Sequence, residues 1–208
     1  FFNVGIAEQN MIGIAAGLST TGKTVFASSF AMFAVGRVYD QIRQSIAYSK
    51  MNVKIVATHA GITVGEDGVS HQMIEDISLM CALPNMKVIV PADTFETKKT
   101  IREVSQEKGP TYVRLGRSKV PNVFNSEDEI KMGKASTLVD GGDITLISSG
   151  IMVSKSLEAA QMLKKDGISA EVINLSTLKP IDRQGIIKSA KKTGCIVTAE
   201  EHNIYIGM

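Results

Sequence analysis

The chain has 208 residues, 44% of them hydrophobic and 21% charged, a balance that allows one large globular domain or two small ones. Its 23 Lys and Arg residues nearly balance its 21 Asp and Glu residues, and the two signs are interspersed. A nucleic-acid or anionic-membrane surface requires a clustered basic face, so the charge pattern argues against both kinds of partner. Aromatic residues make up only 5% and Trp is absent, which also disfavours a base-stacking surface.

Cysteine usage and hydropathy indicate the cellular compartment in which the protein works. Cys81 and Cys195 lie in apolar stretches and form no C-x-x-C or metal-binding spacing, so we expect a reduced, cytoplasmic protein. Only Lys23 is charged between residues 9 and 36, a stretch long enough on paper for a membrane span of about 20 residues. Turn-forming residues at 20–23 interrupt this stretch, so two short buried elements are expected in its place.

The first part of the chain alternates between two kinds of hydrophobic pattern. Apolar residues at i, i+3, i+4 and i+7 predict amphipathic helices, and short β-branched runs bounded by turn residues predict strands. Asp93 is expected to cap a helix that Gly109 and Pro110 end. Helices are expected over residues 7–21, 35–46 and from 94 onward, and strands over 24–27, 53–58, 87–90 and 111–115.

The composition shifts after Arg117. Residues 118–129 are polar and contain Pro121, which predicts a linker, and Asp140 begins a predicted hairpin turn between two strand-like runs. Further strands are expected over 144–148, 170–175 and 196–199, and helices over 153–164 and 182–192. Alternating strands and helices imply right-handed crossovers, so we predict two three-layer α/β domains with mainly parallel sheets, joined near Pro121.

One loop carries an unusual set of polar side chains. His59 and His71 bracket it, and Glu66 and Asp67 lie between them. The loop follows a predicted strand, and α/β folds bind ligands at the carboxyl ends of strands. Any one of these residues is most simply a solvated side chain, but the whole set favours a binding or catalytic site. Zinc is an alternative ligand, although the spacing fits no particular coordination geometry.

Five further residues have both a structural and a functional interpretation. Glu8 starts a predicted helix, where the helix dipole favours a carboxylate, or it is a functional carboxylate buried among apolar neighbours. Phe30 and Phe33 lie three residues apart, on one helical face, where core packing is the usual explanation. Arg114 and Arg117 follow a predicted strand, and they either bind a carboxylate or phosphate bidentately or form surface ion pairs.

Three segments carry a resemblance to a known family: residues 3–10 (NVGIAEQN), 65–72 (GEDGVSHQ) and 112–117 (YVRLGR). Over essentially its whole length the chain resembles the transketolase family of thiamine-diphosphate enzymes, specifically the separate C-terminal subunit of some prokaryotes. The resemblance implies that residues 1–122 are an N-terminally incomplete pyrimidine-binding domain. It also implies that residues 123–208 are a C-terminally incomplete transketolase C-terminal domain.

The resemblance implies cofactor contacts and one catalytic role. Glu8 matches the glutamate that hydrogen-bonds the aminopyrimidine ring of thiamine diphosphate. Phe30 and Phe33 match the aromatic pair that packs against that ring. His71 matches a histidine that faces the reacting carbon and moves protons to and from substrate oxygens.

The resemblance also implies a substrate and a partner. The activity is transfer of a two-carbon ketol unit between sugar phosphates, with Asp67 binding substrate hydroxyls and with His59 and Arg117 binding the phosphate. The family's Gly-Asp-Gly motif for the diphosphate and Mg²⁺ (or Ca²⁺) is absent from this sequence. An N-terminal transketolase subunit is therefore expected to supply it, in a dimer of heterodimers, and this chain alone is expected to be inactive.

Three alternatives remain open. 1-Deoxy-D-xylulose-5-phosphate synthase shares residues 5–9 and an Asp-Gly-x-x-His pattern, but it usually has Arg in place of His59 and lacks the acidic Glu66. The β-subunit of 2-oxo acid dehydrogenases shares the domain plan but normally lacks the Gly-Glu-Asp-Gly…His pattern. A non-catalytic α/β interaction module, with Glu8 and His71 as structural residues, predicts no thiamine-diphosphate binding even when a partner is present.

Overall fold

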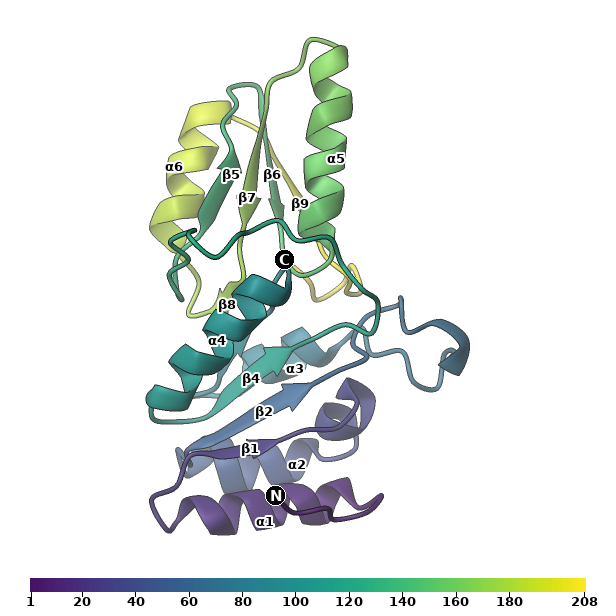
Figure 1. Ribbon diagram of the computed structural model, residues 1–208, viewed down its shortest axis with the longest axis vertical. Coiled ribbons are helices and arrows are strands. Elements are labelled where there is room, and N and C mark those ends of the chain that lie inside the picture. Colours follow the sequence, from purple (N-terminus) through teal and green to yellow (C-terminus); the bar gives the residue numbers. More distant parts are fainter. The chain divides into compact units, whose positions relative to one another are not determined.

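A computed structural model describes every residue from Phe1 to Met208 (Figure 1). The chain divides into two compact units, each assembled from segments that are separate in the sequence. The first unit contains Phe1–Ile89, Ile101–Ser118 and His202–Gly207. The second unit contains Val90–Thr100, Lys119–Glu201 and Met208.

The first unit is built on parallel strands that lie in the order β1-β2-β4-β3. These strands are β1 (Val25–Ala27), β2 (Val53–Ala57), β3 (Lys87–Ile89) and β4 (Thr111–Arg114). All four residues of β4 and all but Val56 of β2 are buried, as expected for inner strands of a parallel sheet that is covered on both faces. All four strands were predicted within one or two residues.

Helical segments of several kinds accompany this sheet in the first unit. They are α1 (Glu8–Ser19), the π-helical η1 (Met32–Gly36), α2 (Tyr39–Gln41), the π-helical η2 (Ile42–Tyr48), the 3₁₀ turn η3 (Gly65–Asp67), α3 (Asp76–Ala82) and the last turns of α4 (Thr94–Gln106). The helix α1 packs against β1, and its buried apolar residues are Ile12, Ala15 and Ala16 (Figure 1). The helix itself is confirmed, but of the residues whose spacing predicted its inward face, Met11, Ile14, Ala15 and Leu18, only Ala15 is buried. The helix α3 was not predicted.

The second unit contains a four-stranded sheet in the order β5-β7-β6-β9. Its strands are β5 (Ser136–Val139), β6 (Ile144–Ser148), β7 (Ala170–Asn174) and β9 (Ile196–Ala199), and β8 (Thr177–Lys179) follows β7. The helices α5 (Met152–Lys165) and α6 (Arg183–Thr193) lie on opposite faces (Figure 1). Two right-handed crossovers that run in opposite directions along a sheet produce this arrangement.

The hairpin predicted around Asp140 is wrong. The residues after Asp140 do connect β5 to β6, but β7 lies between these two strands and pairs antiparallel with β5 and parallel with β6. All five residues of β7 are buried, and an inner position between two neighbours satisfies both of its backbone edges.

The predicted linker is anchored to the second unit. Asp93 caps α4, since its Oδ1 accepts the Glu96 amide at 2.8 Å. Its Oδ2 accepts the amides of Val123 and Phe124, each at 2.8 Å. Phe124 is buried against Val153 of α5, so this polar segment is held at its centre.

The fold class predicted from the sequence, α/β with mainly parallel sheets, is confirmed. No helix in the structure has the length and apolar character needed to cross a bilayer.

Candidate functional site

The predicted site residues gather at the carboxyl edge of the first unit's sheet. Because β1, β2 and β4 are parallel neighbours, the residues that follow them lie side by side. Phe30 follows β1, His59 follows β2 and Arg117 follows β4. Phe30 forms a parallel bridge with Thr58 and precedes η1, so the single helical face predicted for Phe30 and Phe33 is wrong.

Four aromatic rings nevertheless form one cluster. Phe30 stacks on His59 with ring centroids 3.6 Å apart and on Phe33 at 6.2 Å. His71 presents its ring edge-on to Phe30 at 6.2 Å and to Phe33 at 5.2 Å. His71 is itself oriented by Ser70, whose Oγ lies 2.9 Å from Nδ1. The structure therefore brings His71 to both phenylalanines and His59 to Phe30.

His59 adopts a strained backbone conformation. Its φ is +59°, a value uncommon outside glycine that often marks a functional site. Burial lowers the pKa of His59, as does the positive charge of Arg117, while Asp67 acts in the opposite direction. The neutral imidazole is thereby favoured, with one donor and one acceptor nitrogen, and the Thr58 hydroxyl lies 2.9 Å from Nδ1.

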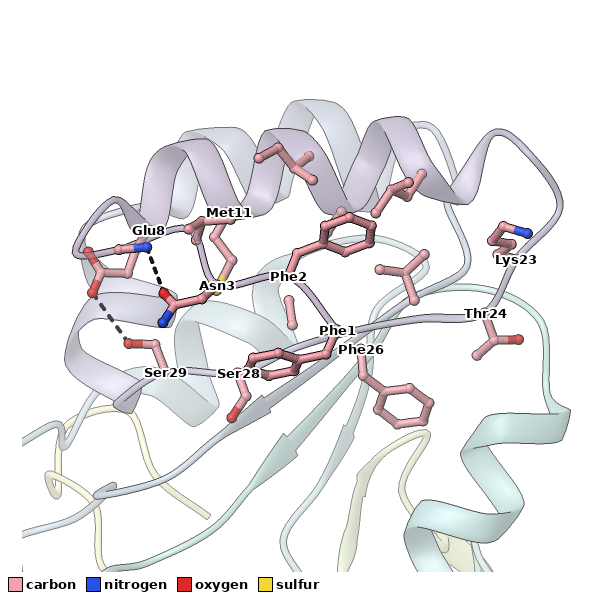
Figure 2. A pocket seen from close by; sticks show the side chains of 17 residues that line it. Phe1, Phe2, Asn3, Glu8, Met11, Lys23, Thr24, Phe26, Ser28 and Ser29 are labelled. Atoms are coloured by element: carbon pink, nitrogen blue, oxygen red, sulfur yellow. Dashed lines mark hydrogen bonds between the residues drawn. The ribbon is translucent and has the colours of Figure 1, made fainter.

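Glu8 is the first residue of α1 and is 8% exposed. Its Oε1 accepts the Ser29 hydroxyl at 3.3 Å, and its Oε2 accepts Arg37 Nη1 at 3.1 Å. The carboxylate is buried, as its functional interpretation requires, but its recorded partners are a cation and a hydroxyl, and the neighbouring Ile6 is 93% exposed. Figure 2 shows Glu8 and Ser29 at one end of a pocket of about 590 Å³ between α1 and β1.

Arg37 was missed by the sequence analysis. Its guanidinium carbon lies 4.4 Å from the centre of the Phe33 ring, so Arg37 connects the Glu8 carboxylate to the aromatic cluster. The available signal was its isolation: Arg37 is the one charged residue between Lys23 and Asp40. A lone cation in an apolar stretch calls for an anionic partner.

Arg114 is a buried residue, and its ion pair with Asp76 is buried as well. It is 5% exposed, and its Nε donates to Asp76 Oδ2 at 2.7 Å, an oxygen that also accepts the Tyr112 hydroxyl at 2.6 Å. Its Nη2 reaches the Met73 carbonyl at 3.4 Å, which also accepts the Gly61 amide at 2.8 Å. Arg114 therefore helps to close the base of the loop that carries the histidines.

Arg117 lies against that same loop. Its Nη1 donates to the Val64 carbonyl at 2.8 Å, and its Nη2 donates to Glu66 Oε1 at 3.1 Å. Its Nε lies 4.0 Å from Asp67 Oδ2. The side chain is 36% exposed, so solvent or a ligand can still reach it.

Comparison with known proteins now assigns the family. Residues 1–123 match the family model described as "Transketolase, pyrimidine binding domain", and residues 133–208 match the one described as "Transketolase, C-terminal domain". The chain belongs to the transketolase family. The resemblance stated from the sequence motifs is confirmed, whereas the domain boundary after residue 122 stays a prediction.

Individual transketolase relatives agree. A Methanocaldococcus jannaschii protein named as a transketolase C-terminal section is 55% identical, covering 100% of this chain and 66% of the relative. A 6-deoxy-6-sulfo-D-fructose transketolase subunit of Clostridium is 43% identical, covering 99% and 64%. A solved structure described as "Split gene transketolase, inactive beta4 tetramer" superposes with a TM-score of 0.93 at 53% identity, covering 100% and 67%. The chain spans about two thirds of the length of these relatives.

The transketolase family implies thiamine diphosphate and a divalent metal, and the residues present fit one part of that group. After its bonds to Ser29 and Arg37, the Glu8 carboxylate retains acceptor positions, and the Phe30–Phe33 pair lies close by. This combination suits an aminopyrimidine ring. No three His, Cys, Asp or Glu side chains of the chain converge to hold a metal ion.

Proposed function

We propose that the chain is the C-terminal subunit of a transketolase, in which it works with an N-terminal subunit to transfer a two-carbon ketol unit between sugar phosphates. One observation carries the proposal. The buried carboxylate of Glu8, the Phe30–Phe33 pair and the two loop histidines lie together at the carboxyl edge of a parallel sheet. Binding sites of α/β folds occur at this edge.

The cofactor side of the site consists of Glu8, Phe30 and Phe33. Thiamine diphosphate, when bound, supplies the electron sink that stabilises a carbanion. Glu8 would accept a hydrogen bond from the aminopyrimidine ring, and the two phenylalanines would pack against that ring. Arg37 and Ser29 each hold one oxygen of Glu8, so they orient the carboxylate before the cofactor arrives.

The substrate side consists of the histidine loop and Arg117. His71, whose ring stands edge-on to the phenylalanine pair, would move protons at the substrate oxygens, because imidazole can both donate and accept a proton. Asp67 would accept substrate hydroxyls. His59 and Arg117 would hold the phosphate, the first as a neutral donor and the second as a charged one.

A partner subunit completes the proposal. The chain brings no metal-binding group together, so we propose that the N-terminal subunit holds Mg²⁺ (or Ca²⁺) and the diphosphate. The solved relative is described as an inactive β4 tetramer of a split-gene transketolase, which supports a requirement for a second kind of subunit here. Two copies of each subunit, in the cytoplasm, are the proposed assembly, and residues 1–122 and 123–208 are its proposed domains on this chain.

The test is a ketol-transfer assay. The complete subunit is purified with its N-terminal partner and supplied with xylulose 5-phosphate, an aldose phosphate acceptor, thiamine diphosphate and Mg²⁺. We expect transfer by the complex and none by this chain alone. Absence of transfer by the complex, or turnover without any partner, would contradict the proposal.

A further inference from the structure

The position of the Arg117 guanidinium depends on one glycine, Gly65. The guanidinium lies on the backbone of the 64–67 turn, where Nη1 donates to the Val64 carbonyl and Nη2 donates to Glu66. Gly65 lies between these two contacts and has a φ of +80°. The turn thus presents a bare stretch of backbone to the arginine.

A side chain at Gly65 would occupy the position of the guanidinium. A Cβ atom there would overlap Arg117 Nη1, at a separation below the 3.0 Å that real Cβ atoms keep, and it would lie 3.7 Å from Cζ. Apart from the chain neighbours of Gly65, no other residue comes within 4 Å of that position. The side chain that an added Cβ would meet is therefore that of Arg117.

The overlap would be relieved by moving Arg117. Its guanidinium is the free end of a flexible side chain, whereas the turn is held by backbone bonds, including the Gly68 amide to the Gly65 carbonyl at 3.1 Å. The arginine would give up its bond to the Val64 carbonyl and point elsewhere. Because Gly65 has a φ of +80°, the substitution would also strain the backbone of the turn, so a control with the same strain is needed.

We propose that Gly65 is a specificity-determining residue for phosphorylated substrates, because it seats the Arg117 guanidinium where its outer nitrogens can receive a phosphate. The inference deepens the proposed function and rests on it. Val64 fixes Nη1, while the Glu66 carboxylate on Nη2 is 87% exposed. Exposed ion pairs are weak, so a dianionic phosphate can replace Glu66 at that nitrogen without unseating the arginine.

Gly68 provides the matched control. It lies in the same turn with a φ of +71° and a ψ of −166°, a region essentially restricted to glycine. A Cβ at Gly68 meets only the Glu66 carbonyl, at an ordinary 3.9 Å. Gly68→Ala therefore imposes at least comparable backbone strain without touching Arg117.

The experiment measures KM and kcat in the complete two-subunit enzyme for a ketose phosphate and for the same ketose without its phosphate. The variants are Gly65→Ala, Gly68→Ala, Arg117→Ala and the double variant Gly65→Ala/Arg117→Ala. We expect Gly65→Ala to raise KM for the ketose phosphate about tenfold, the effect of one lost charge-assisted contact, and to leave KM for the unphosphorylated ketose within about twofold. Gly68→Ala should change both substrates alike, and the double variant should match Arg117→Ala.

Two results would overturn the inference. One is the same change of KM, for both substrates, in Gly65→Ala and Gly68→Ala. The other is an additive effect of Gly65→Ala and Arg117→Ala, because independent effects would mean that the glycine does not act through the arginine.

A substrate-free measurement separates this inference from the proposed function. In urea unfolding, Gly65→Ala should lower the midpoint more when Arg117 is present than in the Arg117→Ala background, because the contact to Val64 is already absent there. If the unmodified complex transfers no ketol unit, the proposed function is refuted. The comparison of urea midpoints would still decide whether Gly65 positions Arg117. Equal midpoint losses in the two backgrounds would refute that seating.

Discussion

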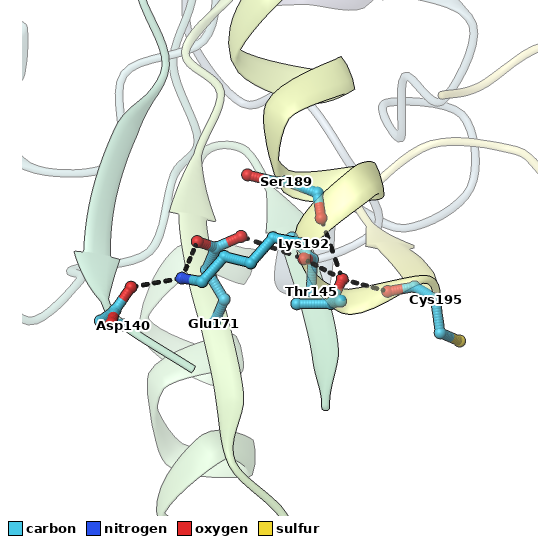
Figure 3. Close-up of polar contacts among 7 residues, drawn as sticks. Asp140, Thr145, Glu171, Ser189, Lys192 and Cys195 are labelled. Carbon is cyan, nitrogen blue, oxygen red and sulfur yellow. Dashed lines mark hydrogen bonds and ion pairs between the residues drawn. The ribbon is translucent and has the colours of Figure 1, made fainter. Parts of the chain in front are cut away.

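Each unit of the chain buries a glutamate beside a cation, and the two pairs differ in what surrounds them. Glu8 in the first unit pairs with Arg37 next to the aromatic cluster, and its oxygens each have one partner. In the second unit, Oε1 of Glu171 pairs with Lys192, which also binds Asp140 (Figure 3). Oε2 of Glu171 accepts the Thr145 hydroxyl at 3.0 Å.

The position along the strands separates the two pairs. Glu171 and Thr145 are register partners near the amino ends of β7 and β6, whereas Glu8 contacts Ser29, which follows the carboxyl end of β1. Ligands of α/β folds bind at carboxyl ends. A buried acid with a cation is therefore not in itself a site: the edge of the sheet and the neighbouring rings distinguish a binding carboxylate from a structural one.

The largest expected effect of this difference is on catalysis. We expect Glu8→Ala to reduce kcat for ketol transfer by the assembled enzyme on the order of 10³-fold, because the carboxylate proposed to bind the cofactor is removed. The control is Glu171→Gln, which should keep kcat within about twofold. Steady-state kinetics on both variants test this difference between Glu8 and Glu171. Undiminished ketol transfer by Glu8→Ala would refute it.

Glu171→Gln should act on stability. The side chain is 5% exposed and satisfies Lys192 and Thr145, so neutralising it should lower the free energy of unfolding by about 2 kcal/mol. Urea unfolding followed by circular dichroism measures the change. Lys155→Gln, which breaks an exposed ion pair with Glu158, is the matched control and should change stability by less than about 0.5 kcal/mol. Equal losses of unfolding free energy in the two variants would show that the buried ion pair stabilises the fold no more than the exposed one.

The fold was largely predictable because its signals are local. The position of α1 and the β-branched run of β2 follow directly from residue spacing, although the spacing assigned the buried face of α1 to the wrong residues. The hairpin prediction failed because the turn after Asp140 does not reveal which strand will lie between β5 and β6. The helix α3 was missed because it has only seven residues, so the spacing between Ile77 and Met80 is not repeated along it.

The site residues were predictable only where they belong to a short sequence motif. Glu8 and His71 stand in segments that resemble the family, and His59 begins the loop that contains the second of these segments. The structure places all three residues in or beside one aromatic cluster. Arg37 and the Asp76–Arg114 pair were missed because their partners come from distant parts of the sequence. Long-range contacts of this kind leave no spacing that a single sequence can show.

Acid should weaken the second unit's pair. Burial tends to raise the pKa of Glu171, but hydrogen bonds from Lys192, Ser189 and Thr145 outweigh it, so the pKa is lowered from its usual 4.5. A lowered pKa means that the stabilisation is present above about pH 4.5 and is lost as the pH falls through the folded-state value. The stability difference between wild type and Glu171→Gln should therefore shrink on acidification below that pH. Urea midpoints measured from pH 6 downward test this, and a constant difference would contradict it.

The smallest expected effect concerns Glu66. Its ion pair with Arg117 is exposed, and a phosphate would have to displace it. We expect Glu66→Gln to lower KM for a ketose phosphate about twofold and to leave kcat unchanged, because the pair is worth under about 1 kcal/mol. An increase of KM would show that Glu66 assists phosphate binding.

The most direct test of the contrast between the two glutamates is the affinity of the assembled enzyme for thiamine diphosphate. Isothermal titration calorimetry in the presence of Mg²⁺ would compare wild type, Glu8→Ala and Glu171→Gln. We predict that Glu8→Ala raises Kd at least tenfold, the loss of one charge-assisted hydrogen bond, and that Glu171→Gln leaves Kd unchanged. Equal Kd values for wild type and Glu8→Ala would contradict the assignment of this sheet edge as the pyrimidine site.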